Sequence, residues 1–191
     1  MDHLRYRSGV GEFPRFCDVN VPALTARVKD YFQDSSDVPP LLWHWWSTGE
    51  IPEDDFRLLL PLAWMMSGEA DGAVKFDQWL KMFEHLAFFT DLDQFFSEGD
   101  SDLGQPPRDM RRLYRGHNVD CMRSFAWTDS VARAEWFAER NRKWGTPTFV
   151  FVADIPPEAI LGVLTGRWPE REYVIHPNRL HGDATPRIMA P

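Results

Sequence analysis

Two glutamates near the C-terminal end, Glu170 and Glu172, are spaced for acid–base chemistry. They open the segment EREYVIHP (residues 170–177), whose apolar half is typical of a strand. Residues i and i+2 of a strand share a face, so both carboxylates would point the same way. Such a pair suits reactions at a glycosidic bond, because one carboxylate can stabilise positive charge on the sugar while the other handles a proton. The alternative is an exposed edge strand without a catalytic role.

A basic residue, Arg115, stands at the end of another predicted strand and is followed by Gly116. A guanidinium at a strand end can present two parallel N–H groups to phosphate oxygens. The glycine would let a flat ligand approach the backbone. The alternative is an arginine that makes a structural salt bridge.

A hydroxyl stands beside an indole in the segment FAWT (residues 125–128), just before a predicted helix. Thr128 could bond a sugar or an amide, while the ring of Trp127 forms one wall of a slot. The alternative is a helix-capping threonine next to a buried tryptophan.

The elements that must position these residues change in type near residue 105. Before it the pattern is helical, with a helix from residue 22, another after Pro52 that Pro61 is expected to kink or end, and a short one over 91–96. The clearest amphipathic helix covers 73–89, where Phe76, Leu80, Phe83 and Ala87 recur at helical spacing.

After residue 105 the pattern is that of short strands around one helix. Strands are predicted at 111–116, 146–155, 159–164 and 170–177, with an edge strand within 179–189. The helix begins after Thr128 or Asp129 as its cap and stops at Gly145. We therefore predict an α+β protein, with a helical lobe over 1–104 and a mostly antiparallel core over 105–191.

Composition narrows the class of protein. The chain has 191 residues, 43% of them hydrophobic and 26% charged, which is ordinary for a soluble protein. Its two cysteines, Cys17 and Cys121, lie far apart and match no zinc-ligand spacing, so we expect no metal and a reduced, cytoplasmic protein. The first twenty residues contain no apolar run, and no segment approaches the length of a membrane span, so no membrane association is expected.

The net charge of −8 is unevenly distributed along the chain. Residues 1–107 carry 8 Lys/Arg against 19 Asp/Glu, a balance of −11, whereas residues 108–143 carry 9 against 5, a balance of +4. Binding to nucleic acid by overall charge is therefore disfavoured. A local positive field remains around 108–143, where an anionic ligand could bind, unless these arginines are simply solvated. Nucleic-acid binding by these arginines would require tight, salt-sensitive affinity despite the net charge of −8.

The order of these features resembles the mono-ADP-ribosyltransferase family of the Arg–Ser–Glu type. An Arg-Gly strand end is followed by an aromatic-Thr turn that opens a helix, and then by a late strand with Glu-x-Glu. The resemblance covers roughly residues 111–177 and not the helical lobe. It implies an ADP-ribosyltransferase-like core that transfers ADP-ribose from NAD to a macromolecule. It also implies a toxin- or effector-like protein of bacterial or phage character, with an antitoxin or inhibitor as a partner.

The resemblance implies a role for each matching residue. Glu172 would be the catalytic glutamate that bonds the ribose 2′-hydroxyl, and Glu170 would orient or deprotonate the acceptor. Arg115 would contact the phosphates and ribose of NAD. The backbone of Gly116 would hold the nicotinamide amide.

The remaining positions of the resemblance fall on the aromatic-Thr turn. An aromatic wall for the nicotinamide would come from Trp127 or Tyr114. The Ser-x-Thr/Ser motif of the family falls on residues 126–128, and its first serine is replaced by Ala126. Either Ser124 would substitute through a shift in register, or Thr128 alone would orient NAD.

Three functions follow from this sequence. The first is NAD-dependent transfer of ADP-ribose to a macromolecular acceptor. The second is NAD glycohydrolysis, in which water replaces the acceptor. The third is an interaction protein that keeps the fold without catalysis, a reading prompted by Ala126. The acceptor itself is left open between a protein arginine, RNA, DNA and a small molecule.

Overall fold

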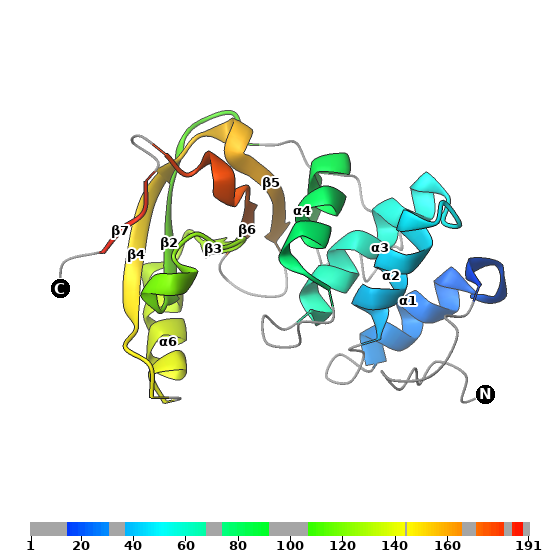
Figure 1. The fold of residues 1–191 in the computed structure, drawn as a ribbon, viewed down its shortest axis with the longest axis horizontal. Helices are drawn as coiled ribbons and strands as arrows, with labels where there is room; N and C mark the ends of the chain where they lie inside the picture. Colours follow the sequence, from blue (N-terminus) through cyan, green and yellow to red (C-terminus); the bar gives the residue numbers. More distant parts are fainter. Residues whose placement is uncertain are drawn as a thin grey trace. The chain divides into compact units, whose positions relative to one another are not determined.

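The computed structural model describes residues 15–30, 37–67, 74–91, 107–143, 145–165, 171–181 and 185–188. The chain divides into two compact units, Met1–Leu86 and Ala87–Pro191. Within the described residues it is an α+β protein with five α-helices and a mixed sheet of seven strands (Figure 1). The predicted fold class is confirmed at this level.

The first unit is helical. Its α-helices are α1 (Val21–Asp30), α2 (Val38–Ser47), α3 (Glu53–Met66) and α4 (Phe76–His85), preceded by a 3₁₀ turn at Phe16–Asp18. Three acids in the first turn of α3 oppose the helix dipole, and Pro52 is its N-cap, as its sequence predicts. Pro61 lies inside α3 and does not end it, contrary to one of the two expectations. Aromatic side chains fill the interior, and Trp45, Phe56 and Phe83 are fully buried.

The second unit is built on one sheet. Its strands are β1 (Phe88–Asp91), β2 (Arg111–His117), β3 (Ala126–Thr128), β4 (Phe149–Ile155), β5 (Ile160–Thr165), β6 (Glu172–Ile175) and β7 (Arg187–Ile188). They lie in the order β1-β5-β6-β3-β2-β4-β7. Only β1 and β5 pair in parallel, and the other pairs are antiparallel. The predicted edge strand near the C-terminal end is confirmed as β7.

The boundary between the units lies earlier than the sequence predicts. Helix α4 ends at His85, and Leu86 is already extended. Residues Phe88–Asp91, expected at the end of that helix and the start of another, form β1 and pair with β5. The division therefore falls between Leu86 and Ala87 and not at residue 104. Except for Asp91, the helix predicted over 91–96 lies outside the described residues.

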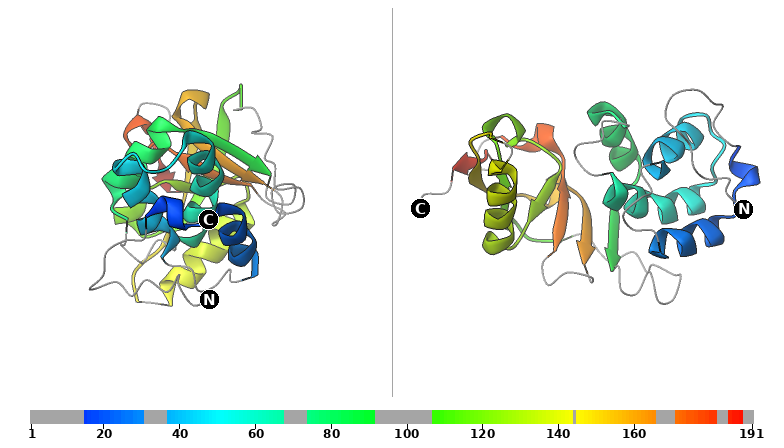
Figure 2. Two further views of the ribbon diagram at one scale, coloured as in Figure 1. Left: turned by 90° about the vertical axis from the view of Figure 1, so that its right-hand side faces the viewer. Right: turned by 90° about the horizontal axis from the view of Figure 1, so that it is seen from below.

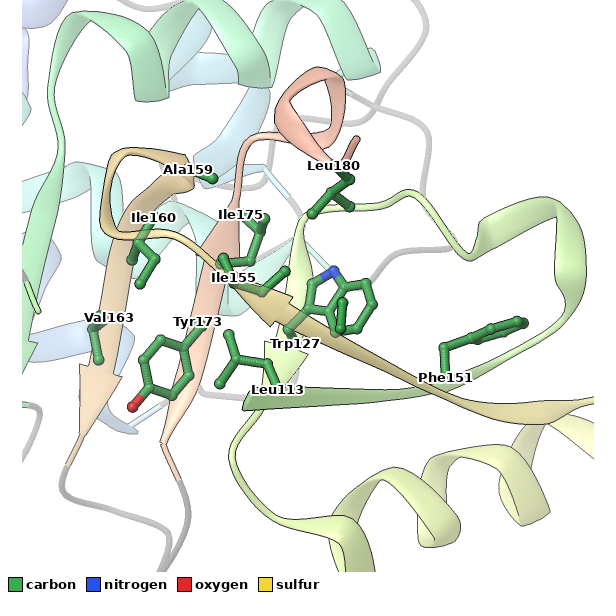
Figure 3. Packing of buried hydrophobic residues seen from close by; sticks show 11 residues of the cluster. Leu113, Trp127, Phe151, Ile155, Ala159, Ile160, Val163, Tyr173, Ile175 and Leu180 are labelled. Atoms are coloured by element: carbon green, nitrogen blue, oxygen red, sulfur yellow. The ribbon is translucent and has the colours of Figure 1, made fainter. Parts of the chain in front are cut away.

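The two faces of the sheet differ in what covers them. One face carries a hydrophobic core drawn from five strands, including Leu113, Trp127, Phe151 and Tyr173 (Figure 3). The opposite face packs against α6 (Val131–Arg142), which runs beside β2 and β4 in Figures 1 and 2. Residues at successive positions of each strand therefore alternate between the core and the α6 side.

An ion-pair cluster joins β2, β4 and β7 at one end of the sheet. Arg112 donates two hydrogen bonds to Asp154, from Nε to Oδ1 at 2.7 Å and from Nη2 to Oδ2 at 3.1 Å. Arg187 Nη2 lies 3.4 Å from Oδ2 of the same carboxylate. The hydrogen bond from Arg112 lowers the pKa of Asp154 below its ordinary value.

The lowered pKa predicts how stability depends on pH. A carboxylate with a depressed pKa in the folded state stabilises the fold above its unfolded pKa, about 3.9, and the contribution disappears as the pH falls through the folded value. Asp154→Asn should therefore destabilise the protein slightly at pH 7 and less at about pH 3. Urea denaturation at both pH values measures the difference, with the exposed Asp120→Asn as control. An equal loss at both pH values would contradict the assignment.

Candidate active site

Three side chains form a row across adjacent strands on the α6 side of the sheet. The register pairs Tyr114 of β2 with Thr128 of β3, and Thr128 with Glu172 of β6. Directly paired residues point to the same face, with Cβ atoms roughly 4.5–5.5 Å apart. A phenol, a hydroxyl and a carboxylate thus stand side by side, although they lie far apart in the sequence.

Glu172 is the first residue of β6 and is half-buried. Both of its neighbours are attached to Asp129, which follows β3. The backbone N–H of Arg171 donates to Oδ1 of Asp129 at 3.1 Å, and the hydroxyl of Tyr173 donates to Oδ2 at 3.4 Å. One carboxylate therefore holds the chain on each side of Glu172 and ties the start of β6 to the end of β3.

The turn between β3 and α6 is closed by hydroxyl groups. Ser130 is the N-cap of α6, and its Oγ accepts the N–H of Arg133 at 3.2 Å. Thr128 Oγ1 accepts the N–H of Ser130 at 3.1 Å. The sequence predicted Thr128 or Asp129 as the cap, and this is corrected to Ser130. Asp129 is instead used by β6, which leaves the next hydroxyl to cap the helix.

Arg115 belongs to the other face of the sheet. It pairs with Phe151 and alternates with Tyr114, so its side chain lies on the core face and is only 5% exposed. Its guanidinium donates from Nε to the carbonyl of Cys121 at 2.9 Å and from Nη1 to the carbonyl of Ala126. Arg115 thereby anchors the loop before β3 and β3 itself. This placement departs from the predicted contact with the NAD phosphates.

Gly116 lies on the α6 side, where it makes close contact with the helix. A Cβ at this position would lie 1.7 Å from the carbonyl oxygen of Ala134 and 2.6 Å from the nitrogen of Ala138. The carbonyl of Gly116 accepts a hydrogen bond from Asn141 Nδ2 at 3.3 Å. The missing side chain is thus required by the packing of α6 on β2, whereas the sequence suggested room for a flat ligand.

The aromatic-Thr turn contributes one residue to the row and one to the core. Trp127 is 2% exposed, lies in the hydrophobic core, and donates from Nε1 to the carbonyl of Ser124 at 2.9 Å (Figure 3). The expectation of an exposed indole is therefore corrected: of the two proposed aromatic walls, only Tyr114 shares the face of Glu172. β3 pairs Thr128, and not Ser124, with Glu172, so Thr128 is the hydroxyl that lies beside this glutamate.

The remaining predictions concern Glu170, a metal site and a membrane span. Glu170 lies outside the described residues. No group of three or more His, Cys, Asp or Glu side chains within the described part of the chain is arranged to hold a metal ion. Within that same part, no helix is both long enough and apolar enough to cross a membrane.

Comparisons of the chain with protein-family models, curated proteins and solved structures gave no match. Sequence reasoning missed Asp129, whose place before a helix is typical of a cap. Its hydrogen bond to the backbone of Arg171, beside β6, has no local signal, because residues 129 and 171 are more than forty positions apart.

Proposed function

We propose that this protein is an NAD-dependent mono-ADP-ribosyltransferase, with Glu172 as its catalytic residue. The observation that supports the proposal most is the row of Tyr114, Thr128 and Glu172, with the chain on both sides of Glu172 attached to Asp129. A carboxylate and a hydroxyl can hydrogen-bond a ribose and stabilise charge on it, and an aromatic ring can pack against a nicotinamide. Sequence alone suggested the residue types, and the register adds their proximity.

The chemistry follows from these side chains. Glu172 would accept a hydrogen bond from the ribose 2′-hydroxyl and stabilise positive charge on the sugar as the bond to nicotinamide breaks. Thr128 would orient the ribose, and Tyr114 would pack against the nicotinamide ring. The sugar carbon then forms a bond to the acceptor nucleophile, whose proton is taken up by a base, and nicotinamide leaves with the electrons of the broken bond.

The place of Arg115 changes its proposed role. Its Nε and Nη1 groups donate to two backbone carbonyls, so we infer that it acts by holding β3, and thus Thr128, in place. A buried guanidinium is stable only when its donors are satisfied in this way. Arg115 is therefore a positioning residue in this proposal.

The proposal is tested with NAD labelled on its adenylate phosphate. Incubation of the full chain with labelled NAD and a cell lysate should place label on macromolecules. Treatment of the products with protease or nuclease then separates protein from nucleic-acid acceptors. Free ADP-ribose without labelled macromolecules would show that the enzyme hydrolyses NAD and does not transfer ADP-ribose. Unchanged NAD would overturn both enzymatic functions.

The attachment of the chain around Glu172 to Asp129 yields a separate prediction. Asp129→Ala removes both hydrogen bonds, and we expect it to lower kcat about 10- to 100-fold with little change in the KM for NAD, because small displacements of a catalytic group have effects of that size. Asp129→Asn should retain much of the activity, since the amide oxygen can accept the N–H of Arg171 and the amide nitrogen can donate to Tyr173.

The control for this prediction is Asp120→Ala, which removes an exposed carboxylate from the same unit. Tyr173→Phe removes one of the two bonds and should give an intermediate kcat. If Asp129 had only a structural role, Asp129→Ala would have a lower melting temperature than the wild type but the same kcat as Asp129→Asn. Equal kcat values for Asp129→Ala and the wild type would contradict the prediction.

A further inference from the structure

One face of helix α6 points away from the sheet. Ala134 and Ala138 are buried, and their backbone lies against Gly116 of β2. Half a turn away, Trp136 is 47% exposed, although indole is among the largest apolar side chains. We define the outer face of α6 as Arg133, Trp136 and Arg140. This face points away from the sheet, and its aromatic ring is left half-exposed.

The guanidinium groups of this face are gathered over aromatic rings. The Cζ of Arg133 lies 4.5 Å from the centre of the Trp136 ring and 4.9 Å from that of Phe137. The Cζ of Arg140 lies 5.5 Å from the centre of the Trp136 ring. Trp136 and Phe137 themselves meet edge to face, with ring centres 5.0 Å apart. Two cations thus stand near one half-exposed ring, one before it and one after it along the helix.

The acids of α6 lie on the other flank of Trp136. Arg133 and Arg140 are seven positions apart and share one side of the helix, whereas Glu135 and Glu139 are four apart and share the opposite side. Glu139 is paired with Arg142 at 2.8 Å. The outer face is therefore locally positive, within a segment, 108–143, that carries 9 Lys/Arg against 5 Asp/Glu in a chain of net charge −8.

We propose that the outer face of α6 binds a single-stranded polynucleotide. Bases stack on aromatic rings and on guanidinium planes, and phosphates pair with arginines, so the surface complements both parts of such a chain. An acidic peptide would match the charge but would leave the exposed indole without a flat partner. If the proposed transferase function is correct, on which this last step rests, a polynucleotide is also the acceptor of ADP-ribose.

The test measures binding without NAD, so it does not depend on catalysis. Fluorescence anisotropy of fluorescein-labelled dodecamers, oligo(dT) and oligo(U), is titrated with the full chain, and their comparison distinguishes DNA from RNA. Binding of either should weaken about tenfold or more in Trp136→Ala, because loss of one base stack has that effect. The double variant Arg133→Ala/Arg140→Ala should reduce the slope of log affinity against log salt by about 1.4.

The matched control is Arg142→Ala, which removes the same charge from the same helix but has no ring contact with Trp136. It should bind the dodecamers nearly as well as the wild type and better than Arg133→Ala. The inference is overturned if the wild type binds neither dodecamer, if Arg142→Ala weakens binding as much as Arg133→Ala, or if a polyglutamate peptide binds more tightly. If the protein binds the dodecamers but leaves NAD unchanged, the transferase proposal is overturned and the polynucleotide-binding role of the outer face of α6 stands.

Discussion

Glu172→Gln is expected to lose nearly all transfer activity while the protein remains folded. The substitution preserves the size of the side chain and its ability to form hydrogen bonds but removes the negative charge. In the proposed mechanism that charge stabilises the sugar as nicotinamide leaves, so kcat should fall at least about 100- to 1,000-fold. The KM for NAD should change much less, because the interaction is strongest in the transition state.

Rates of nicotinamide release and of label transfer measure this effect, and circular dichroism and thermal melting measure folding. The matched control is Glu158→Gln, the same change at an exposed position of the 3₁₀ turn Pro157–Ala159 in the same unit. It should leave kcat unchanged. Full activity of Glu172→Gln would end the assignment of this glutamate, whatever the result for the control.

Gly116→Ala is expected to have the largest effect on stability. The new methyl group would lie 1.7 Å from the carbonyl oxygen of Ala134 and 2.8 Å from its carbonyl carbon. These are backbone atoms of α6, so no side-chain rotation relieves the clash, and the helix must move away from β2. We expect a loss of about 3 kcal/mol or more in the free energy of unfolding, a large fraction of the stability of an ordinary domain.

Chemical denaturation measures this loss, with Gly145→Ala as its control. Gly145 has a φ of +81°, and an added Cβ would meet no atom of the described residues within 4 Å apart from its chain neighbours, so alanine there carries only the conformational cost of about 1–2 kcal/mol. Gly116→Ala should be clearly less stable than this control. Because a displaced α6 would also move Ser130 and Asp129, any folded Gly116→Ala protein should be less active. Wild-type stability of Gly116→Ala would contradict the close packing of α6 on β2.

The local sequence pattern predicted those helices and strands that have a strong hydrophobic or turn signal of their own. A run of β-branched and aromatic residues predicted β4, and α6 ends at Arg142, three residues before the predicted stop at Gly145, which has a positive φ. The last turn of the predicted 73–89 helix was wrong, because residues Phe88–Asp91 pair with β5. A short apolar run has no intrinsic preference between helix and strand that can outweigh a strand partner more than seventy positions away.

Local sequence signals indicated which chemical groups are available and which elements carry them. They placed Glu172 within a strand and Thr128 before a helix. Which of these groups face one another depends on the tertiary fold. The register of β2, β3 and β6 puts Tyr114, Thr128 and Glu172 on the α6 side, and strand alternation turns Arg115 and Trp127 into the core.

The physical reason is that side chains alternate along a strand, so a shift of one residue in pairing would exchange the two faces. That register is set by pairing and core packing between segments distant in the sequence, and no local pattern encodes it. The same holds for Asp129. Its position in the sequence predicts a helix cap, but in the folded chain it accepts hydrogen bonds from the two residues beside Glu172. The position of Asp129 in the sequence does not indicate that Arg171 and Tyr173 are its partners, because these contacts form only in the folded chain.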